Sequence, residues 1–138
     1  MNIDSIQNGV VIDHIQAGGG MKLYELLGLD TIECSVALIR NVSSKKMGRK
    51  DIIKIDGDIS VNLDVIGYVD PDATVNIIRN GNLVEKKSIP MPEQLVNVIQ
   101  CKNPRCITTC EQELDHVVRL TDCEQKVYRC IYCETKAN

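Results

Sequence analysis

The hydrophobic pattern along the first ninety residues predicts strands and helices in alternation. Runs rich in β-branched residues, bounded by glycine or polar residues, predict strands; they occupy residues 10–15, 33–41 and 50–56. Apolar side chains recurring every three or four positions predict helices over 21–29 and 58–69. Asp58 or Ser60 is expected to cap the second helix, and Asp70-Pro71 to end it.

Residues 73–87 predict a hairpin, because two strand-like runs flank Asn80-Gly81, a pair that type I′ turns favour. The order β-α-β-β-α-β-β is close to the ferredoxin-like pattern with one extra strand. We therefore expect an α+β fold, in which a ferredoxin-like antiparallel sheet carries two helices. Pro90 and Pro92 interrupt the pattern, and a short helical linker is expected to start at Pro92. The expected domains are residues 1–95 and 96–138.

Composition narrows the classes of function. The chain has 138 residues, enough for one ordinary domain or two small ones. Acidic residues outnumber basic ones in the first domain and equal them in the second, so neither offers the positive surface that nucleic acid requires. No apolar run approaches the ~18 residues of a membrane span, and no signal-like segment opens the sequence. A cytoplasmic protein without membrane or nucleic-acid partners is expected.

Six of the seven cysteines lie in the last forty residues, and their spacing predicts a metal site. Cys101 and Cys106 form a C-x4-C pair, and Cys130 and Cys133 form a C-x2-C pair. Two such loops can surround one tetrahedral Zn²⁺ with four thiolates, which leaves no open position for water or substrate. We therefore expect a small β domain built around one structural zinc ion.

Two other interpretations of the cysteines stay open. The cysteines could instead form disulfides, which a reducing compartment disfavours. They could also be buried free thiols, which act as small hydrophobic side chains. Cys110 is the main rival ligand, whereas Cys34 lies in an apolar run and is expected to be buried. No role is assigned to Cys123.

No catalytic motif is present in the sequence. It contains neither a Gly-x-Ser-x-Gly nor a Walker loop, and His14 and His116 are its only histidines. The glycine triplet at 18–20 lacks the following Lys-Ser/Thr of a phosphate loop and is interpreted as a flexible loop. The chain is therefore expected not to be an enzyme.

Several segments together resemble one known family, the regulatory chain of aspartate carbamoyltransferase. They are "GVVIDHI" (9–15), "MGRKDIIKI" (47–55), "ATVN" (73–76), the Pro-Glu linker and the C-x4-C…C-x2-C tail, in that order. The resemblance runs nearly end to end. It implies an allosteric subunit whose N-terminal domain binds CTP as inhibitor and ATP as activator and pairs with a second regulatory chain. Its zinc domain would contact the catalytic chain.

The resemblance also implies which residues bind the nucleotide. They are Val11, Asp13, His14, Lys50, Lys54, Asn76, Ile78, Leu83 and Lys86. Where the family has an aromatic residue that would wall the base or ribose, this chain has Gly81.

The residue pattern supports part of this site. Lys50 and Lys54 share one face of their strand, roughly 13 Å apart, and can bracket a triphosphate; a solvated strand face is the plainer interpretation. Asp13 has no obvious local cation, which suits an acceptor for a base amino group. Lys86 has the wrong parity and needs a bulge or a frayed strand end to reach the phosphates.

A zinc-ribbon adaptor that binds nucleic acid is the alternative function. Its support is a basic loop formed by Lys45, Lys46, Arg49 and Lys50. Salt-sensitive binding of DNA or RNA would favour it.

Overall fold

The computed structural model describes residues 6–57, 59–111 and 113–137, and it divides into two compact units. The division falls between Pro90 and Met91, whereas the sequence pattern placed the boundary near residue 95. Among the described residues, none of the helices has the length and apolar content that crossing a bilayer requires.

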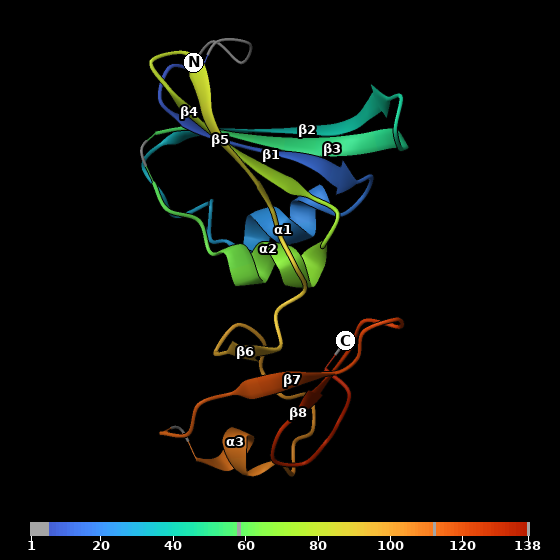
Figure 1. Ribbon diagram of the computed structural model, residues 1–138. Helices are drawn as coiled ribbons and strands as arrows, with labels where there is room; N and C mark the ends of the chain where they lie inside the picture. Colours follow the sequence, from blue (N-terminus) through green and yellow to red (C-terminus); the bar gives the residue numbers. More distant parts are fainter. Residues whose placement is uncertain (1–5, 58, 112, 138) are drawn as a thin grey trace. The chain divides into compact units, whose positions relative to one another are not determined.

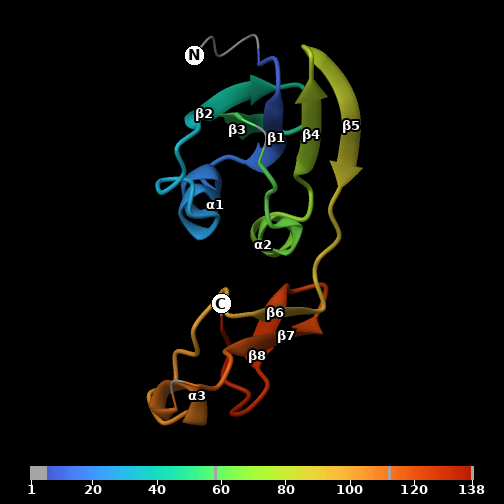
Figure 2. The same cartoon turned by 90° about the vertical axis from the view of Figure 1, so that its left-hand side faces the viewer.

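The first unit is a five-stranded antiparallel sheet with both helices on one face (Figures 1 and 2). The strand order is β2-β3-β1-β4-β5, so the first strand lies in the centre and the added strand β5 at one edge. This arrangement confirms the predicted ferredoxin-like α+β fold. In chain order the elements are β1 (Gly9–Gln16), α1 (Gly20–Leu26), β2 (Ser35–Ser44), β3 (Gly48–Asp56), α2 (Leu63–Val69), β4 (Thr74–Arg79) and β5 (Asn82–Ser88).

The core of this unit lies between the sheet and the two helices. Alternate side chains of the central strands point toward the helices, and they are Ile12, Ile53, Ile55 and Val75. Leu23 of α1 and Ile66 of α2 are fully buried on the helix side. The period-2 alternation leaves the other half of each strand on the face without helices, which we call the open face.

The β4–β5 hairpin has the predicted turn, but α2 is shorter than predicted. Asn80 and Gly81 both have positive φ, at 53° and 79°, as a type I′ turn requires. The predicted cap at Ser60 is wrong, because the Asn62 side chain accepts hydrogen bonds from the N–H groups of Asp64 and Val65 and so fixes the start of α2. Asp58, the other predicted cap, lies outside the described residues.

The glycine triplet is anchored by Asp51, a carboxylate with no exposed surface. Asp51 Oδ2 accepts hydrogen bonds from the N–H groups of Gly18 and Gly20, at 3.1 and 3.0 Å. Its Oδ1 accepts one from the N–H group of Asn41, at 2.8 Å. A side chain at Gly20 would collide with Asp51, since its Cβ would lie 2.8 Å from Oδ2. The interpretation of this triplet as a flexible loop is therefore wrong.

The second unit is a three-stranded antiparallel sheet with one short helix. Its elements are β6 (Gln94–Val96), α3 (Ile107–Cys110), β7 (Val117–Asp122) and β8 (Val127–Cys130), with sheet order β6-β7-β8. The predicted helical linker at Pro92 is wrong, because Leu95 is buried and pairs with Val118 across β6 and β7. The buried Tyr128 hydroxyl donates to the carbonyl oxygen of Pro92, at 2.7 Å.

Replacing Asp51 should destabilise the first unit. Asp51→Ala leaves three backbone N–H groups without their acceptor, and each buried unsatisfied donor costs about 1–3 kcal/mol. We expect the free energy of unfolding to fall by at least about 2 kcal/mol in urea titrations followed by circular dichroism. Asp56→Ala, at the exposed end of the same strand, is the control. Equal destabilisation by both variants would contradict the anchoring role of Asp51.

Candidate functional site

Four cysteine side chains form a compact cluster in the second unit, and they are Cys101, Cys106, Cys130 and Cys133. All four Sγ atoms lie within 4.8 Å of one another. The Cys101 and Cys133 sulfurs are 3.5 Å apart, and those of Cys106 and Cys130 are 3.7 Å apart. A tetrahedral zinc ion with Zn–S bonds of ~2.3 Å has S···S edges of about 3.8 Å, so this spacing fits such an ion. It is far from the ~2.05 Å of a disulfide.

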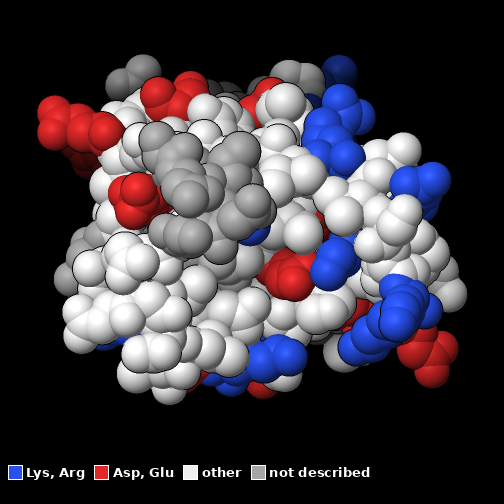
Figure 3. Space-filling view, turned by 90° about the horizontal axis from the view of Figure 1, so that it is seen from above, with Lys and Arg blue, Asp and Glu red and all other residues white. Residues whose placement is uncertain are grey.

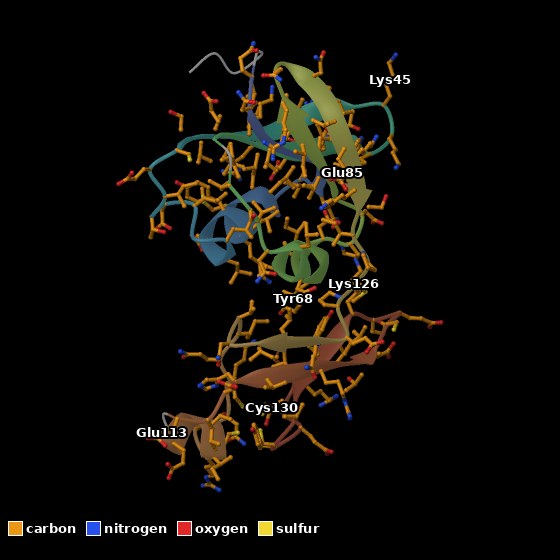
Figure 4. The ribbon with its side chains drawn as sticks, turned by 60° about the vertical axis from the view of Figure 1, so that its left-hand side comes forward. Lys45, Tyr68, Glu85, Glu113, Lys126 and Cys130 are labelled. Atoms are coloured by element: carbon orange, nitrogen blue, oxygen red, sulfur yellow. The ribbon has the colours of Figure 1, made fainter. Side chains whose placement is uncertain are left out.

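Two tight turns and two element ends bring the sulfurs together. Cys106 directly precedes α3, and its N–H group donates to the carbonyl oxygen of Asn103, which closes the C-x4-C turn. Cys130, labelled in Figure 4, ends β8. Its carbonyl oxygen accepts a hydrogen bond from the N–H group of Glu134. Glu134 has a φ of 63°, so the C-x2-C turn reverses the chain within a few residues. Backbone geometry thus sets the position of each pair.

Two threonines form the nearest polar surroundings of the sulfurs. The Thr108 hydroxyl lies 3.1 Å from the Cys106 sulfur, and the Thr135 hydroxyl lies 3.2 Å from the Cys133 sulfur. Each threonine follows the second cysteine of its pair by two positions, so the arrangement repeats in both loops. This Cys-x-Thr spacing is visible in the sequence, but the hydroxyls were not predicted to contribute.

These hydrogen bonds shift the acidity of the thiols. The hydroxyl and N–H groups of Thr135 lower the pKa of Cys133 to about 6, and those of Thr108 lower the pKa of Cys106. Burial instead raises the pKa of Cys101 to about 12. A metal ion binds thiolates and displaces their protons, so the hydroxyls favour the metal-bound form. Four sulfur ligands complete a tetrahedron, which suits a structural rather than a catalytic ion.

Two further cysteines, Cys34 and Cys123, lie outside the cluster. Cys34 is half-buried beside Gly57, whose Cβ, if it had one, would lie 2.3 Å from the Cys34 sulfur. Cys123 is exposed. The side chain of Cys110, the rival ligand, lies outside the described part of the structure.

On the open face of the first unit, one row of paired residues crosses four strands. Lys54 pairs with Val11, Val11 with Asn76, and Asn76 with Lys86. Directly opposed residues project from the same face of a sheet, so both ammonium groups stand on the open face. The register of β4 and β5 shifts between Ile77 and Ile78, and this irregularity gives Lys86 the parity to join the row. The Asn76 Oδ1 atom is buried and has no hydrogen-bond partner among the described residues.

A bulge in β1 places Asp13 and His14 beside this row. The register with β3 shifts between Ile12 and Ile15, and both of these isoleucines face the core. The two residues between them therefore share the open face, and His14 has a φ of 58°. His14 Nδ1 lies 3.1 Å from the Thr74 hydroxyl, a contact that was not predicted because it depends on the β1–β4 register.

Asp13 does have a local cation, contrary to the prediction. The Lys50 ammonium lies 2.9 Å from Asp13 Oδ1, and both side chains are largely buried. Although burial raises the pKa of Asp13, the hydrogen bonds from Lys50 and from the His14 N–H group together hold it below its usual value. The bulge brings the two strands' side chains together here, which the sequence pattern did not indicate.

The apolar members of the predicted set complete the open face. Ile78 pairs with Leu83 across the β4–β5 hairpin, and Leu83 is 59% exposed. Gly81 lies in the turn between them, where its N–H group donates to the carbonyl oxygen of Gln7. Eight of the nine residues predicted from the resemblance thus belong to three groups on one face: the row, the bulge and the hairpin. The ninth, Lys50, contacts the bulge through its ion pair with Asp13.

Removing either threonine hydroxyl should weaken metal binding. For Thr108→Val and for Thr135→Val we expect the dissociation constant for Zn²⁺ to rise about 10- to 100-fold, because groups that hydrogen-bond to the ligands orient them and stabilise thiolates. Competition with a chelating dye measures this. Thr121→Val is the matched control, since its hydroxyl donates to the Val127 carbonyl oxygen instead. Equal affinities in all three variants would rule out a role of the hydroxyls.

Comparison with known proteins places both units in one family. Residues 1–90 match the family described as aspartate carbamoyltransferase regulatory chain, allosteric domain, and residues 93–138 match its metal binding domain. The regulatory chain of Bifidobacterium longum is 47% identical over 137 residues, covering 99% of each chain. That of Clostridium tetani is 47% identical over 135 residues, covering 97% of this chain and 94% of the relative. The chain therefore belongs to the family of aspartate carbamoyltransferase regulatory chains, which are non-catalytic subunits.

Proposed function

We propose that this chain binds CTP and ATP on the open face of its first unit and transmits their effect to a catalytic chain held by its zinc-bound second unit. Family membership supports a regulatory role with separate allosteric and metal-binding domains. The identity of the effectors, of the metal and of the partner chains is our proposal. CTP is expected to inhibit and ATP to activate at one shared site.

The row Lys54–Val11–Asn76–Lys86 carries the nucleotide proposal. It spans three gaps between strands, or about 14 Å, with an ammonium group at each end. A polyphosphate is the anion class that such a spaced pair of cations suits on an otherwise acidic chain. Asn76 Oδ1 has no hydrogen-bond partner in the described part of the chain, and an unmade hydrogen bond of a buried atom is costly. An exocyclic amino group of a base would satisfy it after a small side-chain rotation.

The neighbouring groups have complementary roles in this proposal. Lys50 adds a third cation, and its pairing with Asp13 keeps both charges stable in the partly buried site until a ligand approaches. His14 and Asp13 are placed to contact the base and ribose. Ile78 and Leu83 form an apolar wall on the hairpin. Gly81 offers no side chain beside them, so this wall is thinner than one built with an aromatic residue.

Zn²⁺ in the second unit would order the surface that contacts the catalytic chain. The two cysteine loops depend on one another through the shared ion, so removing it would release both. A second copy of this chain is the proposed partner of the first unit. A nucleotide changes catalysis only if it binds one state of the assembly more tightly than the other, and this difference sets the size of the effect.

The basic end of the β2–β3 hairpin favours the alternative of nucleic-acid binding. Lys45, Lys46 and Arg49 are exposed there, and Lys and Arg side chains gather along the right-hand side of the face seen in Figure 3. The remaining surface is mixed, and Asp and Glu side chains lie on the same view. A mobility shift of DNA or RNA that weakens with salt would support this alternative.

The first test of the nucleotide site is Lys54→Ala. It should weaken CTP and ATP together by about 10- to 150-fold, because both triphosphates lose the same charge-assisted contact. Isothermal titration of the full chain measures both affinities. Lys46→Ala, on the exposed hairpin end, is the matched control and should bind as the unaltered chain does. Unchanged titration curves for Lys54→Ala would return that lysine to the role of a solvated side chain.

The metal site is tested by Cys130→Ser. We expect this variant to lose its zinc ion and its association with the catalytic chain, while its nucleotide affinity persists because the open face lies in the other unit. Native mass spectrometry measures zinc content, and size-exclusion chromatography measures association. Cys123→Ser, an exposed cysteine outside the cluster, should retain both. Full zinc content in Cys130→Ser would show that the ligands are misassigned.

A further inference from the structure

A cavity of about 200 Å³ lies in the first unit on the helix-covered face of the sheet. The row Lys54–Val11–Asn76–Lys86 lies on the opposite face. The floor of the cavity consists of alternate side chains of β1 and β4, namely Val10, Val75 and Ile77. Leu63, at the start of α2, contributes to the wall. The non-helical segment that precedes α2 lines the rest of the cavity, through Ile59, Ser60 and Val61.

The charged side chains among the described lining residues are both basic. Arg79 follows Val75 and Ile77 with the same parity on β4, and Lys87 pairs with Val75 from β5, so both cations project toward the cavity side. The Lys87 ammonium lies 3.7 Å from Glu85 Oε1, but these side chains are 37% and 56% exposed. An exposed ion pair at that distance contributes little and can be exchanged for another anion.

We propose that this cavity binds a small organic anion, a carboxylate carried on an apolar body about the size of a benzene ring. An apolar cavity of about 150 Å³ in another protein holds benzene, so the volume here suffices for such a ring and a carboxylate. The valines and isoleucine contact the ring, and Arg79 and Lys87 bind the carboxylate. The cavity thus combines apolar side chains on its floor with polar groups that converge on one part of it, a combination typical of small-molecule sites.

The cavity and the nucleotide row use different side chains of the same strands. Val10 faces the cavity whereas Val11 belongs to the row, and Val75 and Ile77 flank Asn76 on β4. Successive side chains of a strand point to opposite faces, so the two ligands do not compete for space. This site is therefore distinct from the proposed nucleotide site and does not depend on it.

The test uses 4-fluorobenzoate as the probe and ¹⁹F NMR titration of the full, zinc-loaded chain. We expect saturable binding that 1:1 addition of ATP does not displace. The uncharged analogue 4-fluorobenzyl alcohol should bind at least about tenfold more weakly, because it lacks the charge that the two cations recognise. Absence of saturable binding, equal affinity for the alcohol, or displacement by ATP would each overturn the proposal.

Variants locate the probe. Arg79→Gln should weaken 4-fluorobenzoate at least about tenfold without touching the core, whereas Lys46→Gln, a cation outside the cavity, should leave its affinity unchanged. Ile77→Trp should abolish binding by filling the cavity, with circular dichroism to establish that it folds. If Ile77→Trp does not fold, the Arg79→Gln and Lys46→Gln pair decides. Equal affinities in these two variants would place the probe elsewhere and overturn the proposal.

Discussion

The second unit depends on one set of contacts, those among four cysteine sulfurs. Its buried apolar residues outside the cluster are few, with Leu95, Val118 and Tyr128 at their centre. A core of this size seldom stabilises a domain unaided, and a structural metal ion is a common substitute. The first cysteine loop ends where α3 begins, and the second begins where β8 ends, so an ion bound by the sulfurs also fixes α3 and β8. Zinc binding and folding of this unit are therefore expected to be one process.

The first unit is organised by its central strand, β1. Residues pointing one way pack against the helices, and residues pointing the other way form the open face. The bulge at Asp13 and His14 interrupts this alternation and puts two polar side chains where a regular strand would place one. His14 adopts a left-handed conformation that side chains with Cβ disfavour, and such strain is common at binding sites. Asp51 holds the segment that follows β1 through hydrogen bonds from the N–H groups of Gly18 and Gly20.

The sequence pattern predicted the elements well where it is periodic and turn residues are unambiguous. Alternating strands, the Asn80-Gly81 turn and the paired cysteines each have a local signal, and the structure contains all three. The start of α2 was misplaced because Asn62 outcompetes the earlier capping candidates once the helix packs. The strand β6 was mistaken for a helix because its pairing with β7 is a distant contact that local propensity cannot show.

The candidate site shows the same division between local and distant information. The spacing of Lys50 and Lys54 along the sequence is enough to predict that they share one face of a strand. The family resemblance supplied the rest of the predicted set. The ion pair of Lys50 with Asp13, and the contact of His14 with Thr74, depend on strand register and on a bulge. Anchoring of the glycines by Asp51 joins positions some thirty residues apart. Such contacts form only once the chain has folded, so no short segment of the sequence predicts them.

We infer that this chain makes a catalytic subunit responsive to nucleotides. The most direct measurement reconstitutes the zinc-loaded chain with the matching catalytic chain and records aspartate saturation with CTP, with ATP and without either. Our account predicts that CTP shifts the curve to higher aspartate concentration and ATP to lower, while the catalytic chain alone responds to neither. Superimposable curves for an assembled complex under all three conditions would contradict it.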